Sequence, residues 1–96
     1  MARGMDALKI LVRREGLSLV AVCLDHYFAV QARDEEALFS LLRRNVAARA
    51  ARAAASDRAP FAGLKKAPWR YWQEWEAAEV LKPGSHPGLV VRVTRA

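Results

Sequence analysis

The sequence of 96 residues has only one cysteine, which excludes an internal disulfide. Cys23 stands in the apolar run LSLVAVCL, where we expect a small buried hydrophobic residue in a reducing compartment. No apolar stretch reaches the ~18–20 residues of a transmembrane helix, and the opening MARGMDALK has no continuous apolar segment of the signal-peptide kind. These absences predict a cytoplasmic protein that does not enter a membrane.

Side chains suited to catalysis or metal binding are also scarce. The two histidines, His26 and His86, fall in predicted loops, and most acidic residues fall in predicted helices or turns. A metal-dependent nuclease needs several converging carboxylates, which this pattern does not indicate. Cys23 and His26 are close in sequence, but this spacing at a strand end does not make a nucleophile pair. We therefore predict no catalytic residue, no metal site and no cofactor.

The composition fits one globular domain over residues 1–96, because 53% of the residues are hydrophobic and a second core would be too small. The formal net charge is +6 and the sequence pI is about 10.3. Such a balance favours an anionic partner, either nucleic acid or an acidic protein surface. A solvated surface without a partner explains the same charge equally well.

Alternation of apolar and polar residues predicts three strands, over residues 7–14, 17–24 and 27–32. Glu15-Gly16 and Asp25-His26 mark the turns between them. The second run is apolar on both faces, so we expect it to be a central strand. The three strands are expected to form an antiparallel meander.

A helix is predicted over residues 35–55, with Asp34 as the expected N-cap. Glu35 and Glu36 place negative charge at the positive end of the helix dipole, which stabilises the helix. Beyond Val46 the helix contains only alanine and arginine, so we expect this half to project past the sheet or to meet another protomer. An apolar stripe at helical spacing should pack on the sheet; its members are Leu38, Leu41, Leu42 and Val46.

Proline and glycine mark a connector over residues 58–68, and Pro68 suits the first turn of a second helix over residues 68–81. Further breakers are Pro83, Gly84 and Pro87, after which residues 89–94 alternate and predict a last strand at an edge. The expected fold class is α+β, in the order βββα-α-β: a three-stranded antiparallel meander plus a C-terminal strand, packed against one long and one shorter helix.

Three tryptophans, Trp69, Trp72 and Trp75, lie within seven residues of the second helix, with Tyr71 among them. They cannot all face one direction, so some should pack on the sheet while another covers the connector or a partner. Tryptophan and tyrosine are frequent interface anchors. A small core beneath the connector is the alternative interpretation.

Basic residues gather on the long helix and around the start of the second helix. Such a set suits a phosphate backbone, although no base-reading motif accompanies it. The alternative is an ordinary charged helix surface. The candidate nucleic-acid contacts are Arg43, Arg44, Arg49, Arg52, Lys65 and Lys66.

Three segments together resemble the HicB-like antitoxin family: LVRREGLSLVAVCLDHYFAVQA, DEEALFSLLRR and PFAGLKKAPWRYWQEWEAAEVL. The resemblance runs from about Leu8 to Thr94 and implies a partial ribonuclease-H-like fold without the nuclease carboxylates. It implies a single-domain branch, with no C-terminal DNA-binding domain. The sequence departs from the family pattern at Gln31-Ala32, where Gln-Gly is usual, and in the turn around His26.

From this resemblance we expect a non-catalytic, antitoxin-like protein-binding module that binds and masks a small ribonuclease toxin or another protein, and that forms a homodimer or higher oligomer. One alternative is a basic nucleic-acid-binding protein that uses the arginine-rich helix. Another is a homo-oligomeric scaffold or regulator on the same fold. The expected partner-binding residues are Tyr27, Phe28, Trp69, Arg70 and Trp72.

Overall fold

The computed structural model describes residues 7–57, 61, 63–80 and 88–94. Within these residues the chain forms a mixed sheet and two helices, so the predicted α+β class is confirmed. The elements are β1 (Leu8–Glu15), β2 (Ser18–Cys23), β3 (Phe28–Ala32), α1 (Glu35–Ala55), α2 (Trp69–Ala77), β4 (Glu79–Val80) and β5 (Leu89–Val93).

The described sheet has the strand order β3-β2-β1-β5-β4. The first three strands are antiparallel neighbours, β5 pairs in parallel with β1, and β4 pairs antiparallel with β5. The last strand was predicted at an edge, but β5 lies between β1 and β4. Strand β2 is interior, as its two apolar faces predicted, while the middle position belongs to β1.

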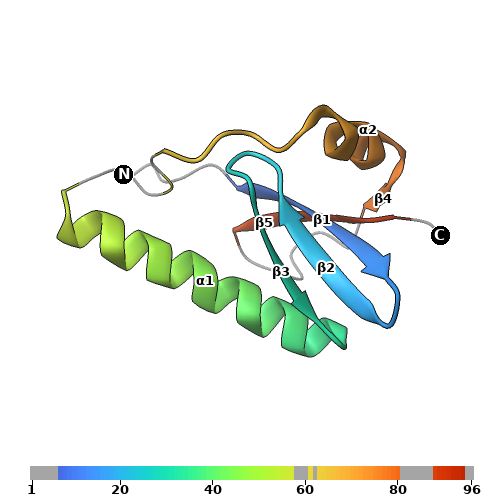
Figure 1. Cartoon of the computed structure of the whole chain (residues 1–96), viewed down its shortest axis with the longest axis horizontal. Coiled ribbons are helices and arrows are strands. Elements are labelled where there is room, and N and C mark those ends of the chain that lie inside the picture. Colours follow the sequence, from blue (N-terminus) through green and yellow to red (C-terminus); the bar gives the residue numbers. More distant parts are fainter. Residues whose placement is uncertain (1–6, 58–60, 62, 81–87, 95–96) are drawn as a thin grey trace.

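The two helices lie on opposite faces of the sheet (Figure 1). On the α1 face, residues such as Ile10, Ala21 and Val30 pack with Leu38 and Leu42. The other face has a smaller core in which aliphatic side chains of β1 and β2 pack against α2; its buried members are Leu11, Val20, Val22, Leu24, Ala67, Tyr71 and Trp75. Because alternate residues of β1 and β2 enter different cores, β2 is apolar on both faces and β1 is apolar on both faces from Ile10 to Val12.

Helix α1 has the predicted bounds. The Asp34 carboxylate accepts a hydrogen bond from the Ala37 N–H at 2.8 Å, which satisfies one of the free amides of the first turn. Leu38, Phe39 and Leu42 are buried, and Val46 packs against the same core. The remainder of α1 runs beyond the ends of the strands (Figure 1). Neither described helix is long and apolar enough to cross a membrane.

Helix α2 is shorter than predicted. It ends at Ala77, and Ala78 has extended backbone angles of φ −82° and ψ 158°. The chain then forms the unpredicted strand β4, which pairs with β5. The predicted last helical residue, Leu81, and the breakers Pro83, Gly84 and Pro87 lie outside the described residues.

Candidate binding surface

The connector between the helices passes around the end of the sheet, beside the β2–β3 turn. The Tyr27 N–H donates to the Lys65 carbonyl at 2.6 Å, and the Ala67 N–H donates to the Leu24 carbonyl at 2.9 Å. Phe61 packs in the core on the α1 face, whereas Ala67 packs in the core on the α2 face. The connector therefore changes faces here and brings the β2–β3 turn next to the start of α2.

Two tyrosines and an arginine meet at this junction. The Tyr27 and Tyr71 ring centroids lie 5.9 Å apart, and an Arg70 N–H donates to the Tyr71 hydroxyl at 3.0 Å. This hydrogen bond lowers the pKa of Tyr71, because a cationic donor stabilises the phenolate. The pKa of Tyr27 is raised, mainly because its hydroxyl is hydrogen-bonded to that of Tyr71. The phenolic groups therefore form a polar cluster beside α2.

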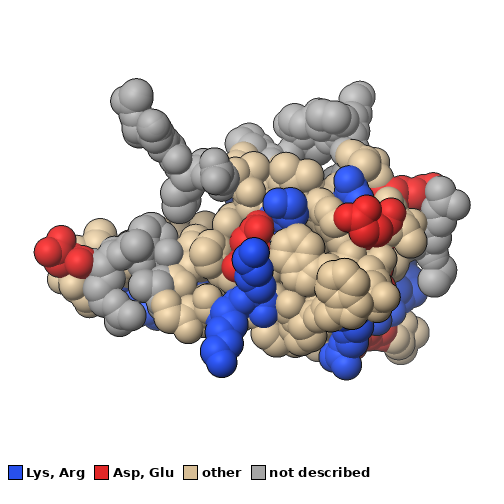
Figure 2. All heavy atoms as spheres, turned by 90° about the horizontal axis from the view of Figure 1, so that it is seen from above, with Lys and Arg blue, Asp and Glu red and all other residues tan. Residues whose placement is uncertain are grey.

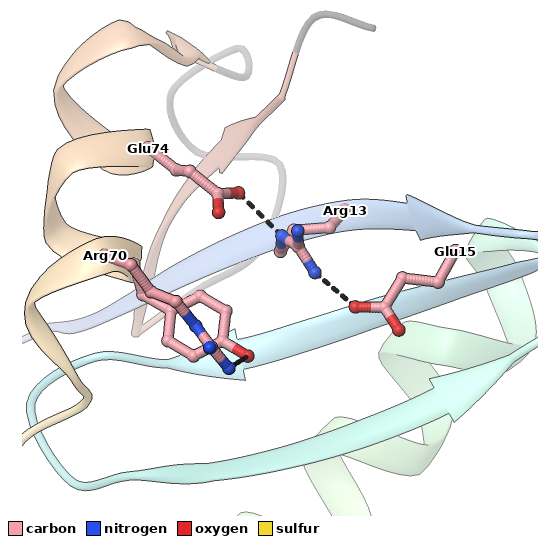
Figure 3. A network of polar contacts seen from close by, with 5 residues as sticks. Arg13, Glu15, Arg70 and Glu74 are labelled. Atoms are coloured by element: carbon pink, nitrogen blue, oxygen red, sulfur yellow. Dashed lines mark hydrogen bonds and ion pairs between the residues drawn. The ribbon is translucent and has the colours of Figure 1, made fainter.

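Arg13 on β1 ties α2 to the sheet. Its Nε–H donates to the Glu74 carboxylate at 2.6 Å, and it is also paired with Glu15 (Figure 3). The hydrogen bond to Glu74 raises the pKa of Arg13. The guanidinium carbon of Arg13 lies 5.5 Å from the centre of the Tyr71 ring, and that of Arg70 lies 4.8 Å away. Two cations thus lie within cation–π distance of the buried Tyr71 ring.

The three tryptophans divide as their spacing predicted. Trp75 is buried with 4% of its surface exposed, and Trp72 is half-buried with its Nε1–H donating to the Ala67 carbonyl at 3.1 Å. Trp69 is 73% exposed. Arg92 on β5 lies over the Trp75 ring at 4.5 Å and donates to the Trp75 carbonyl at 2.8 Å, which satisfies a backbone group at the end of α2.

Three of the expected partner-binding residues, Tyr27, Trp69 and Arg70, are exposed near the start of α2, beside half-buried Trp72. Phe28 is only 8% exposed and belongs to the core on the α1 face. The structure therefore brings together four of the five expected side chains and places Phe28 on the other side of the sheet.

The candidate nucleic-acid contacts lie on two separate elements. Arg43, Arg44 and Arg52 are exposed on α1, while the guanidinium carbon of Arg49 lies 4.6 Å over the Phe28 ring. The other two, Lys65 and Lys66, are exposed on the connector. Figure 2 views the molecule from the side of α2 and shows basic and acidic side chains around uncharged residues.

An aromatic stack holds the connector on the α1 face. Phe61 lies between His26 and Phe28, with ring centroids 4.9 Å and 5.9 Å away. Its φ of 64° is unusual for a bulky residue, so burial of the ring must offset the backbone strain. Proline and glycine marked this segment only as a connector, and no sequence signal identified Phe61 as a core residue.

Sequence reasoning also missed the polar contacts that position α2. Arg13 and Glu74 are 61 positions apart, so no local spacing connects them. Asp25, interpreted only as a turn residue, accepts from the Lys9 backbone N–H at 3.0 Å and pairs with its ammonium group at 3.7 Å. That ammonium group lies 5.9 Å from the Trp72 ring.

Within the described ranges, no three His, Cys, Asp or Glu side chains are grouped to hold a metal ion. Cys23 is fully buried, as expected, and burial raises the pKa of its thiol. A buried thiol of this kind is a poor nucleophile. Near α2 lie exposed aromatic rings and guanidinium groups, and their neighbours Tyr71 and Trp72 are held by hydrogen bonds.

Comparison with known proteins yields no relative. No protein-family model matches the chain, and neither a curated protein nor a solved structure shows significant similarity to it.

Proposed function

We propose that the chain is a non-catalytic protein-binding module, and that it captures its partner with the surface formed by Tyr27, Trp69, Arg70 and Trp72. The observation that carries this proposal is the 73% exposure of Trp69 on the first turn of α2, next to the exposed Arg70. Large aromatic and arginine side chains dominate the binding energy of many protein interfaces. We call this set of four residues the α2 surface.

The neighbours of Trp69 are held in place before any partner arrives. Tyr71 is buried with two guanidinium groups close to its ring, and Trp72 is hydrogen-bonded to the connector. A rigid surface loses less conformational entropy on binding than a mobile one. The α2 surface is therefore suited to take up a partner without rearrangement.

Charge indicates the chemistry of the partner. Arg70 of the α2 surface is exposed, and Lys65 and Lys66 are exposed on the connector beside it, whereas the nearby Glu74 is already hydrogen-bonded to Arg13. The excess positive charge favours a partner that presents carboxylates at the contact. This pairing would set the orientation of the partner around the Trp69 anchor.

The finer part of the proposal is that the module is antitoxin-like and masks a small ribonuclease toxin or its substitute, on a HicB-like partial ribonuclease-H fold. The sequence resemblance supports it. So does the succession of three antiparallel strands, a long helix and a later strand beside β1. The short β4 is the element that the βββα-α-β arrangement lacks.

Capture of the tagged protein from its host, with nuclease treatment, tests the proposal. We expect to recover a protein partner in near-stoichiometric amount. The purified partner should cleave RNA, and addition of the chain should inhibit this cleavage. Trp69→Ala should abolish capture. Leu17→Ala is the matched control, because Leu17 is 93% exposed on the β1–β2 turn. Equal capture by both variants, or recovery of nucleic acid alone, would refute the proposal.

A second candidate is non-specific nucleic-acid binding through α1. One observation favours it: from Ala37 to Ala55 the helix carries four arginines and no acidic residue. Such binding should weaken steeply as salt concentration rises, because phosphate contacts release counterions. Titration of a fluorescent RNA homopolymer at several salt concentrations tests this candidate, with Arg43→Gln/Arg44→Gln expected to reduce the slope. Absent or salt-insensitive binding would exclude it.

A further inference from the structure

The two edges of the sheet differ in how they are protected. Edge strand β3 has the sequence FAVQA, with no charge, proline or glycine over five residues. Edge strand β4 has two residues and includes Glu79. Proteins usually protect sheet edges with charges, proline, bulges or short strands, because free backbone groups there can pair with another chain. Only β4 has such protection among the described edges.

We propose that two copies of the chain associate by pairing their β3 strands antiparallel, about a two-fold axis at Val30. This register uses the whole strand and places Phe28 opposite the partner's Ala32. Phe28 and Val30 already face the core under α1, so the apolar face of the sheet would continue across the interface. The inference goes beyond the proposed function, since Trp69, Arg70 and Trp72 take no part in it.

The same symmetry brings the long helices together. Helix α1 contacts β2 and β3 and runs back along β3 in the opposite direction (Figure 1). The two-fold axis of an antiparallel strand pair is perpendicular to the sheet, so both α1 helices lie on one face and antiparallel. With strands about 4.8 Å apart, helices above the gaps between β2 and β3 are about 10 Å apart, which matches packed helices.

Charge along α1 is complementary in this arrangement. The helix opens with acidic Asp34, Glu35 and Glu36, and its second half carries Arg49 and Arg52. Because Arg49 stacks on Phe28, this basic half of α1 lies beside the Phe28 end of β3. In the proposed register Phe28 pairs with the partner's Ala32. The basic half of one α1 therefore lies beside the acidic start of the other.

Contact between the two α1 helices must supply most of the interface area. A stable interface takes about 800 Å² from each partner. A strand edge of five residues alone falls short of this. The alanines after Val46 have short side chains, which allow two helices to approach closely.

Sedimentation equilibrium of the purified chain tests the pairing. We expect a species of twice the 10.7 kDa chain mass at micromolar concentration. Gln31→Lys places a charge on an exposed position of β3 and should weaken dimerisation at least about tenfold. Val80→Lys is the matched control on the β4 edge and should leave it unchanged; Val80 is 60% exposed. A monomer at all concentrations, or equal effects of both variants, would overturn the proposal.

A charge exchange between two variants tests the helix register. Glu36→Arg and Arg52→Glu should each weaken self-association by about tenfold. Mixing the two should restore a dimer, since both contacts then join opposite charges. Circular dichroism confirms that each variant is folded. Failure of the mixture to associate, with both variants folded and each impaired alone, would contradict the antiparallel α1 pairing.

Discussion

The two faces of the sheet are covered in different ways. On the α1 face, aliphatic and phenylalanine side chains pack against a long helix, and the described contacts there are mostly apolar. On the α2 face a short helix is held by polar contacts: the Arg13–Glu74 ion pair and the hydrogen bonds from Trp72 to the Ala67 carbonyl and from Arg92 to the Trp75 carbonyl. Burial is greater on the first face, and exposed aromatic surface gathers on the second. We conclude that α1 mainly stabilises the sheet, whereas α2 mainly carries exposed side chains such as Trp69 and Arg70.

The largest effect should come from the α1 core. Leu42 is fully buried, so Leu42→Ala removes apolar contacts and leaves a cavity. We expect the free energy of unfolding to fall by about 3 kcal/mol. Urea denaturation followed by circular dichroism measures the change. A loss near that of the exposed control Leu17→Ala would contradict the assigned role of α1.

The N-cap of α1 should contribute less. Asp34→Ala removes the acceptor for the Ala37 N–H and should lower the free energy of unfolding by about 1 kcal/mol. Asp34→Asn keeps an acceptor oxygen and should retain most of the stability. If both variants unfold at the same urea concentration, the Asp34 hydrogen bond has no part in stabilising α1.

On the α2 face, the Arg13–Glu74 pair is partly exposed, and solvent screening limits its contribution. Glu74→Gln should lower the free energy of unfolding by about 0.5 kcal/mol. Glu76→Gln is the matched control, because Glu76 is exposed on the same helix. A drop of several kcal/mol for Glu74→Gln would show that α2 contributes as much to stability as α1 does.

The two tyrosines provide a spectroscopic test of the α2 face, because the chain contains only Tyr27 and Tyr71. Ultraviolet titration should show one phenol ionising below the ordinary pKa of about 10 and one above it. Arg70→Gln should raise the lower value. Two coincident titrations at the ordinary pKa would refute the cluster.

The sign of the stability change follows from these directions. Below the ordinary tyrosine pKa, the lowered pKa of Tyr71 means that the unfolded chain holds more protons, so stability increases as pH rises through that interval. Above the ordinary value, the raised pKa of Tyr27 has the opposite effect, and stability decreases. Stability therefore rises with pH just below the ordinary tyrosine pKa, because of Tyr71, and falls with pH just above it, because of Tyr27.

Local signals predicted the parts of the fold that local interactions determine. The bounds of α1 followed from Asp34 and the apolar stripe. The spacing of the three tryptophans predicted that they would divide between core and surface, but not that Trp69 would be the exposed one. The end of α2 was wrong because residues beyond Ala77 keep a helix-compatible pattern, while pairing with the distant β5 imposes extended backbone. Phe61 and the Arg13–Glu74 contact depend on tertiary packing that no spacing encodes.

The most direct test of the account measures stability and partner affinity on the same Trp69→Ala protein. Because Trp69 is 73% exposed, the free energy of unfolding should change by no more than about 0.5 kcal/mol. The affinity for the captured partner should fall by at least about tenfold, as for an interface anchor. A large loss of stability, or unchanged affinity, would contradict the proposal that the α2 surface binds the partner.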